Sequence, residues 1–385
     1  MTDAEYQREF REFLARVAPG AAERERQRTL LFDEVAQLRG LGFGAQRLPV
    51  ESGGGGASLE ELFAQIIDLS AADANLGHLW RGHLVFVEGL LLDGADASPR
   101  WTDRVAAGAL IGNAQSERQE TAAITTRLDR EGDEITLTGT KYYTTGSIYA
   151  DWIHLAALDG DDRVELTVSA RHAGVDSVDD WDGFGQPLTG SGTTTFDRVP
   201  VDPLDIEPVR TDEARWPYLG SLLQLHLIAV IAGIAQRALD DTVEFVLPRR
   251  RIYGFAGETL PREDPLVQHI VGELSGAANA ARRLVLSVAA DLGGAVDRGS
   301  DPEALRRLQL DVFRLQEVVP RLVLEATSRL FEVGGATAVS NRFALDRHWR
   351  NVRTLASHNP VAQRTRAIGQ HELLGTLPDW KAPGK

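Results

Sequence analysis

The sequence predicts a mainly helical α+β protein, with a helical N-terminal domain, a small central β-barrel or β-sandwich domain and a C-terminal four-helix bundle. Apolar residues recur with a helical period up to about residue 108 and again from about residue 212, whereas the segment between them alternates as strands do. The 385 residues, 43% hydrophobic and 25% charged, suffice for a large globular core. We therefore expect domains at residues 1–108, 109–207 and 208–385.

The N-terminal segment carries two helix signals. Residues 4–17, AEYQREFREFLARV, place their large apolar side chains on one stripe of a helix. Ser58 and Glu61 form a capping-box pattern, so a helix is expected to begin after the glycines at 53–56. Neither these glycines nor GLGFG at 40–44 has the surroundings of a phosphate-binding loop, because no Gly-Lys-Ser/Thr follows the first and a helix precedes the second.

The central segment reads as a series of strands. Residues 122–146, AAITTRLDREGDEITLTGTKYYTTG, alternate between apolar and polar residues, and REGD at 130–133 is a hairpin turn. Long helical patterns return after residue 212. The most apolar of them, residues 218–239, contains Gln224, His226 and Gln236, which favours a helix buried in the protein over a membrane span.

Composition excludes several classes of function. A net charge of -15 argues against a general nucleic-acid binder and against binding to anionic lipid. The absence of cysteine rules out disulfides, thiolate metal sites and a cysteine nucleophile. A signal peptide begins with basic residues followed by an apolar run, whereas the first residues here, MTDAEYQREF, include acidic side chains. No signal peptide is therefore expected, and a cytoplasmic location is.

The stretch TLASHNP, residues 354–360, holds the first candidate for chemistry. Histidine ordinarily titrates near pH 6.5, and the Asn359-Pro360 pair ends a helix in a turn. A histidine at such a bend can act as a proton donor or acceptor, but it can equally be a helix cap or a packed core residue.

Four segments, in order, resemble the acyl-CoA dehydrogenase-fold flavoproteins over nearly the whole chain. LRGLGFGAQRLPVESGGGGASLEEL is similar to their early glycine-rich loop, and GTKYYTTGSIYADWI is similar to the segment that passes the flavin ring. RRRIYGFAG matches their Arg-x-x-aromatic-Gly stretch. LFEVGGATAV takes the place of their Gln-x-x-Gly-Gly turn, with Glu332 where glutamine is usual.

The chain departs from the dehydrogenases at their catalytic base. Where that family has a glutamate that removes the substrate α-proton, this sequence has Ser357-His358-Asn359-Pro360. LDRHWRNVRTLASHNP resembles instead the monooxygenase branch, the two-component group that includes dibenzothiophene monooxygenases and sulfur-acquisition oxidoreductases. The resemblance implies a C4a-hydroperoxide of reduced FMN, with FAD possible, that oxygenates a small aromatic or sulfur- or nitrogen-bearing substrate. A separate NAD(P)H:flavin reductase is expected, because no Gly-x-Gly-x-x-Gly nicotinamide unit is found.

The resemblance also implies roles for individual residues. His358 would protonate or hold the peroxide, with Asn113 and Thr145 as catalytic hydrogen-bond donors near the flavin ring. Both could instead be ordinary turn and strand residues. The further flavin contacts implied are Gln115, Ser116, Gly146, Ser147, Arg250, Glu332, Gly334 and Gly335. Residues such as Arg250 and Glu332 meet the cofactor across a subunit boundary in this family, so a homotetramer is expected.

Three residues of the N-terminal domain are candidates for the substrate pocket: His83, Trp80 and Phe86. Each could instead belong to the core. His78 and His83 are five positions apart, about 140° round a helix, so they do not form one metal-binding face and no metal is expected.

Two other functions stay open. The first is an acyl-CoA dehydrogenase or oxidase with FAD, in which Glu332 or Glu317 replaces the usual base. The second is a non-catalytic relative that binds a ligand or a partner.

Overall fold

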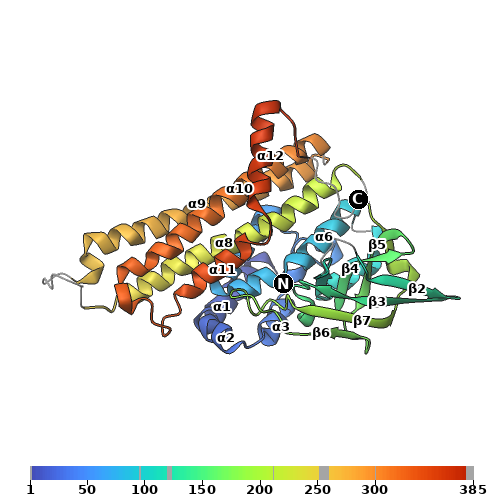
Figure 1. The fold of residues 1–385 in the computed structure, drawn as a ribbon, viewed down its shortest axis with the longest axis horizontal. Helices are drawn as coiled ribbons and strands as arrows, with labels where there is room; N and C mark the ends of the chain where they lie inside the picture. Colours follow the sequence, from blue (N-terminus) through green and yellow to red (C-terminus); the bar gives the residue numbers. More distant parts are fainter. Residues whose placement is uncertain are drawn as a thin grey trace.

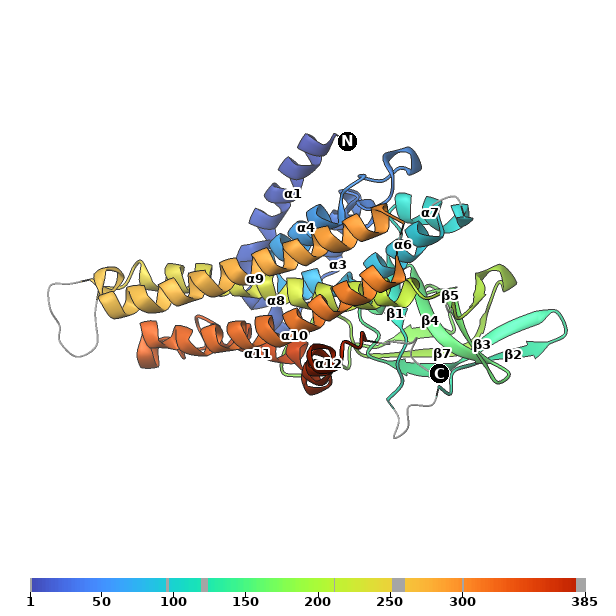
Figure 2. The same cartoon turned by 90° about the horizontal axis from the view of Figure 1, so that it is seen from above.

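The computed structural model describes residues 2–378 apart from 95–96, 119–123, 211, 251–259 and 300. Its long helices form a bundle at one end of the molecule and its sheet lies at the other, with the N-terminal helices packed along one side of both (Figures 1 and 2). This confirms the predicted fold class and the helical, β, helical order.

The N-terminal helices begin and end largely where the sequence signals lie. Tyr6, Phe10, Phe13 and Val17 are buried on one face of the first helix, and the side chains of Ser58 and Glu61 form the predicted capping box. The helices of this segment are α1 (Asp3–Val17), α2 (Ala21–Gln27), α3 (Phe32–Gly40), α4 (Leu59–Ala72), α5 (Ala74–Leu79), α6 (Arg81–Asp93) and α7 (Pro99–Ala106).

The described strands form one mixed sheet in the order β6-β7-β3-β2-β4-β5-β8, with β1 paired to β4. The REGD turn joins β2 to β3, where Glu131 pairs with Glu134. β1 and β2 both run parallel to β4, and the other pairs are antiparallel. The strands are β1 (Ile111–Ala114), β2 (Arg127–Glu131), β3 (Glu134–Tyr142), β4 (Trp152–Asp159), β5 (Asp162–Ser169), β6 (Val175–Ser177), β7 (Thr193–Pro200) and β8 (Ile206–Pro208).

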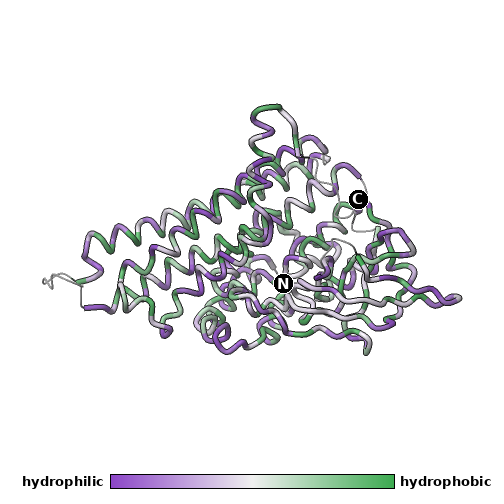
Figure 3. The backbone as a smooth tube through the Cα atoms, viewed as in Figure 1, coloured by the Kyte–Doolittle hydropathy of each residue, from purple (hydrophilic) through white to green (hydrophobic). Residues whose placement is uncertain are grey.

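The C-terminal helices are α8 (Arg215–Val246), α9 (Pro265–Asp297), α10 (Pro302–Arg329), α11 (Asp346–Ala356) and α12 (Val361–Leu374). Hydrophilic and hydrophobic residues alternate along the long helices, as expected when one face of each packs inward (Figure 3). Within the described chain, α8 is the one helix long and apolar enough to cross a membrane, but 94% of its apolar window is buried inside the protein. It is therefore the predicted core helix.

Candidate active site

Two glycines bring the sheet against the junction of α5 and α6. A Cβ atom on Gly82 would lie 2.4 Å from the Cβ of Asn113 in β1, and a Cβ atom on Gly146 would lie 2.6 Å from the carbonyl oxygen of Leu79. Gly146 also has φ 83°, a conformation that favours glycine. Asn113 and the turn that carries Thr145 consequently lie next to each other against this helix junction.

A chain of hydroxyl groups runs from Thr145 into the loop before β7. The Oγ1 of Thr145 is 2.8 Å from the Oγ of Ser191, and that atom is 2.7 Å from the Oγ1 of Thr189. Thr189 in turn donates to the carbonyl oxygen of Gln186 at 3.1 Å. This series of hydrogen bonds fixes the position of the Thr145 hydroxyl, as a hydrogen-bonding residue at an active site requires.

His78 on α5 faces the same loop. Its Nδ1 donates to the Oε1 of Gln186 at 3.1 Å, which leaves its Nε2 and the Nε2 of Gln186 buried without a partner in the described structure. Burial, and then the nearby charge of Arg81, lower the pKa of His78 to about 3. Unpaired buried polar atoms are costly, so these two fit a site that is completed by a bound molecule.

His358 reaches this cluster from the end of α11. Its Nε2 lies 3.3 Å from the Nη1 of Arg81. Because a guanidinium can only donate, the Nε2 of His358 is the acceptor and carries no proton. His358 is accessible to solvent. Its pKa is nevertheless lowered, first because the surrounding protein removes part of the water around the ring, and then by the charges of Arg81 and His78. It is therefore a neutral imidazole at neutral pH rather than one poised near pH 6.5.

Arg81 and His78 were not identified as site residues from sequence, and the same is true of Gln186. Arg81 is 9% exposed and donates from its Nε to the carbonyl oxygen of Leu223 in α8 at 2.9 Å. A signal was present, because a charged side chain in the apolar run NLGHLWRGHLVF is unusual unless something pairs with it.

The flavin contacts expected near Asn113 remain together in the structure. Ser116 is exposed and its carbonyl oxygen accepts from the amide of Tyr142 at 3.0 Å, while Gln115 is partly exposed. Ser147 is buried, and its hydroxyl donates to the carbonyl oxygen of Asn113 at 3.4 Å. Polar side chains at an accessible edge of the sheet fit the polar edge of a flavin ring.

The remaining expected flavin contacts lie at the opposite end of the bundle. Gly334 packs against Phe245, where a Cβ atom would be 2.4 Å from the ring, and Arg250 follows in the same region. Glu332 is exposed and pairs with Arg329 at 3.3 Å, and Gly335 has φ 51°. From Leu223 to Phe245, α8 rises by about 33 Å at 1.5 Å per residue. One chain therefore does not bring both groups to one flavin.

The residues expected to line the substrate pocket are packed instead. His83 has no exposed surface, its Nε2 is 2.9 Å from the carbonyl oxygen of Gly44 and its Nδ1 accepts from the amide of Ile111 at 3.1 Å. A ring with both nitrogens paired offers no edge to a substrate, so His83 is a core histidine. Trp80 is 1% exposed against Phe43, and the ring of Phe86 packs on Trp101.

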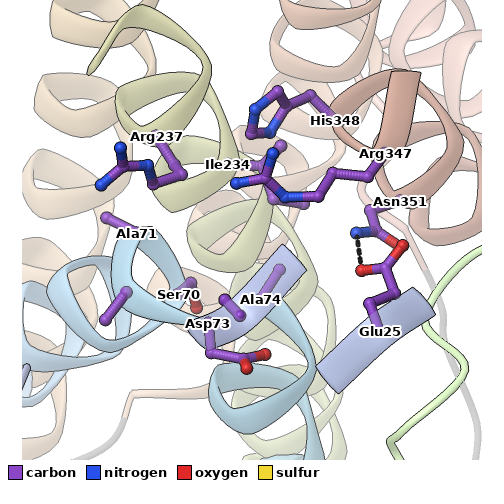
Figure 4. Close-up of a pocket in the computed structure, with 12 residues that line it drawn as sticks. Glu25, Ser70, Ala71, Asp73, Ala74, Ile234, Arg237, Arg347, His348 and Asn351 are labelled. Carbon is purple, nitrogen blue, oxygen red and sulfur yellow. Dashed lines mark hydrogen bonds between the residues drawn. The ribbon is translucent and has the colours of Figure 1, made fainter. Parts of the chain in front are cut away.

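A separate small cavity lies between α4, α8 and α11 and has room for about one water molecule. Figure 4 shows its polar lining, in which the Nδ2 of Asn351 donates to the Oε2 of Glu25 at 2.9 Å. Asp241, beside it, pairs with Arg347 at 2.6 Å. This cavity is too small for a flavin and contains none of the predicted site residues. Among the described residues, no group of three histidines or carboxylates could hold a metal ion.

Two family models match the chain: the acyl-CoA dehydrogenase N-terminal domain at residues 2–109 and its C-terminal domain at residues 225–363. Dibenzothiophene monooxygenase of Rhodococcus qingshengii is 29% identical over 93% of this chain and 90% of its own. The probable FMNH2-dependent monooxygenase SfnC of Pseudomonas putida is 27% identical over 96% and 94%. The crystal structure of TdsC from Paenibacillus sp. A11-2 with FMN and indole matches with a TM-score of 0.90, 28% identity and 99% coverage of both chains.

Proposed function

This chain belongs to the acyl-CoA dehydrogenase family, and we propose that within it the protein is a flavin-dependent monooxygenase. The single observation that carries the proposal is the neutral imidazole of His358, held 3.3 Å from Arg81 where the dehydrogenases have a glutamate base. The similarity to relatives named as monooxygenases over 90% or more of the chain supports it.

Dehydrogenation of an acyl-CoA is disfavoured by the carboxylates that the structure describes. Glu317 pairs with Arg321 at 3.3 Å on α10, and Glu332 pairs with Arg329 at the far end of the bundle. Glu332 lies at the far end of the bundle from His358, and Glu317 is not among the charged groups that shift the pKa of His358. The site therefore lacks, among its described residues, the carboxylate base that removal of an α-proton requires.

In the proposed reaction the flavin is reduced FMN, delivered by a separate reductase. When bound, it would supply the transferred oxygen atom as its C4a-hydroperoxide. The protein's own part is to hold the flavin in place and to exclude water from it. Asn113 and Thr145 present hydrogen-bonding groups beside the α5–α6 junction, and Ser116 is accessible at the edge of the sheet. The Nδ1 of His358 can donate a hydrogen bond in the neutral ring, while its Nε2 remains free to accept a proton if Arg81 moves toward an anion.

The assembly proposed is a homotetramer. The two groups of expected flavin contacts, which α8 separates by about 33 Å, more than one flavin ring can span, support a site shared between copies. The number of four copies is what the family resemblance implies. Arg250 and Glu332 of one copy would then complete the site that holds His358 of another. The substrate proposed is a small aromatic molecule or one that bears an oxidisable sulfur or nitrogen atom.

The test is to mix the protein with photoreduced FMN and oxygen and to record spectra in a stopped-flow instrument. We expect a transient species distinct from oxidised FMN. Immediate formation of oxidised FMN and hydrogen peroxide, with and without candidate substrates, would contradict the proposal. Purification with tightly bound yellow FAD would favour the dehydrogenase or oxidase, and failure to bind flavin in either redox state would favour a non-catalytic relative.

A further inference from the structure

Glu25 places a buried carboxylate where α2 meets α5 and α11. Its side chain is 7% exposed, and its Oε2 accepts from the Nδ2 of Asn351 at 2.9 Å (Figure 4) and from the Nδ2 of Asn75 at 3.4 Å. Its Oε1 accepts from the Nη1 of Arg350 at 3.3 Å. A buried carboxylate requires such donors, so the contacts account for its charge but not for the choice of these three partners.

The three partners of Glu25 also bind the loop that precedes β7, and they do so at every second residue. Each bonds to a backbone group of the loop: the Oδ1 of Asn351 accepts from the amide of Gln186 at 2.7 Å, the Oδ1 of Asn75 accepts from the amide of Leu188 at 3.1 Å, and the Nη1 of Arg350 donates to the carbonyl oxygen of Phe184 at 2.7 Å. One carboxylate is thus connected to residues 184–188 along their whole length.

The carboxylate also sets the direction of these bonds. Because an ionised carboxylate can only accept, both asparagines must turn their Nδ2 groups toward Glu25. Their Oδ1 atoms then face the loop, where backbone N–H groups require an acceptor. An amide in place of the carboxylate could accept at one of its two positions only, so at least one partner would meet a second donor.

The loop needs this support because its backbone is strained at Gln186. This residue is 1% exposed and has φ 55°, a left-handed conformation that is costly for a residue other than glycine. Such a conformation persists only where the surrounding contacts determine it, and Asn351 bonds to the amide of this same residue. Backbone strain that is held in this way occurs often at functional sites.

The same loop positions groups that we assign to the flavin site. The carbonyl oxygen of Gln186 begins the chain of hydroxyl groups that ends at Thr145. The carbonyl oxygen of Thr189 also accepts from the amide of Gly146 at 2.9 Å. Among the described contacts, Glu25 reaches these groups through the loop.

We propose that Glu25 is a positioning residue of the active site. Through its three partners it holds residues 184–188 in the conformation that keeps the Thr145 hydroxyl at the proposed flavin site. The inference rests on the proposed monooxygenase, because it gives the loop a role at that flavin. The hold of Glu25 on the loop, however, can be measured without flavin.

The experiment measures hydrogen exchange of backbone amides by mass spectrometry on the flavin-free full chain. In Glu25→Gln, we expect peptides that cover residues 184–189 and 144–149 to exchange roughly 10- to 100-fold faster, the usual effect of losing a hydrogen bond to a charged group. Peptides from α4 should exchange at the parent rate. Parent rates in both loop peptides would overturn the inference, and so would an equal acceleration in α4, which would indicate general loosening.

The matched control is Glu23→Gln, which removes an exposed carboxylate from the same helix, where it pairs with Arg26. It should leave both loop peptides at the parent rate. If Glu25→Gln does not fold, Arg350→Gln tests the same connection, because that guanidinium is 32% exposed and bonds to both the carboxylate and the loop. Residues 184–189 should again exchange faster, and an unchanged rate would overturn the inference.

A paired substitution provides the rescue. When Glu25→Gln is combined with Asn351→Asp, the amide and the carboxylate trade places. The new amide can then donate to the new carboxylate, which can still accept from the amide of Gln186. We expect the double variant to recover most of the protection that Glu25→Gln loses. Exchange as fast as in the single variant would show that this bonding pattern does not hold the loop.

The reaction separates positioning from simple support of the cofactor site. Glu25→Gln should form roughly 10- to 100-fold less product per flavin oxidised, the scale expected for a displaced catalytic group, while its affinity for FMN stays within about threefold of the parent. Equal losses of FMN affinity and of product would overturn the positioning role. Absence of the transient flavin spectrum in the parent would contradict the proposed function, whereas unchanged exchange in Glu25→Gln would contradict this inference, so the two failures are distinguishable.

Discussion

The Nη1 of Arg81 lies 3.3 Å from the Nε2 of His358, although 277 positions separate the two residues in the chain. The contact joins the α5–α6 junction to the end of α11, and a third element, α8, holds Arg81 through the carbonyl oxygen of Leu223. Among the residues that the structure describes, the imidazole is therefore oriented by a cation and not by a carboxylate. That distinguishes this site from the histidine-carboxylate pairs common in general acid-base catalysis.

The first prediction concerns removal of the imidazole. His358→Ala should fold and bind FMN but make roughly 100- to 10,000-fold less product, the range for losing a general acid or base. Product formed per flavin oxidised is the measurement. Product formation at the parent rate would mean that His358 is only a helix-end residue.

His358→Glu is a sharper change at the same position. The new carboxylate would lie within reach of Arg81 and would repel a flavin peroxide that is anionic before protonation. We expect less product per flavin oxidised than from His358→Ala, measured beside the alanine variant. Activity above that of the alanine variant would contradict the electrostatic argument.

A second prediction uses the close approach of α6 and β1. Gly82→Ala would place a Cβ atom 2.4 Å from the Cβ of Asn113, so the strand or the helix must shift. We expect the free energy of unfolding in urea to fall by roughly 1–3 kcal/mol, as for overpacked sites, and product per flavin to fall with it. Gly40→Ala is the control, because that glycine at the end of α3 has no atom within 4 Å of a new Cβ.

The third prediction is a loss of stability in mild acid. Burial lowers the pKa of three enclosed histidines, to about 3 for His78 and His226 and about 4 for His83. In the unfolded chain each binds a proton below about pH 6.5. The unfolded state therefore takes up more protons, and stability falls as the pH drops from 6.5 toward 4.

Thermal unfolding followed by circular dichroism checks this window. The melting temperature should be level above pH 7 and decrease by many degrees between pH 6.5 and 4.5. Carboxylates with lowered pKa, such as Asp241, add their losses at lower pH and do not obscure it. A constant melting temperature over this range would show that these histidines are not buried in the neutral form.

The last prediction is that the active site is shared between copies of the chain. Light scattering should report a tetramer, and a monomer at micromolar concentration would contradict the shared site. Co-expression of His358→Ala with Arg250→Ala should restore activity that neither variant has alone, because hybrid assemblies contain some sites with both residues intact. No recovery in assemblies shown to be mixed would place the two residues at separate functions.

The sequence predicted the elements well because their causes are local. The apolar stripe of Tyr6 and Phe10, the capping box of Ser58 and the hairpin at Gly132 each depend on residues within one or two turns of chain. Even the core character of α8 follows from its composition. The resemblance to a family then placed Asn113, Thr145 and His358 near one another, and the structure brings Asn113 and Thr145 to the junction that carries Arg81, the partner of His358.

What sequence did not predict depends on contacts between distant segments. His83 and His78 lie in the same apolar run and look alike in sequence. In the structure, both nitrogens of His83 are paired, with Gly44 and Ile111, while one nitrogen of His78 has no partner among the described residues. Arg81 looked like one charge among 41 lysines and arginines. Its burial without a carboxylate becomes visible only when α8 and the end of α11 are placed beside it.

The continuity of α8 has a consequence for how the chain can change in length. One uninterrupted helix carries the carbonyl of Leu223, which holds Arg81, and, about six turns later, Phe245, against which Gly334 packs. Insertion or removal of a single residue between them would rotate one end by about 100° relative to the other and shift it by about 1.5 Å. Substitutions along this span can be absorbed one side chain at a time, but a one-residue change in its length would misalign both ends at once.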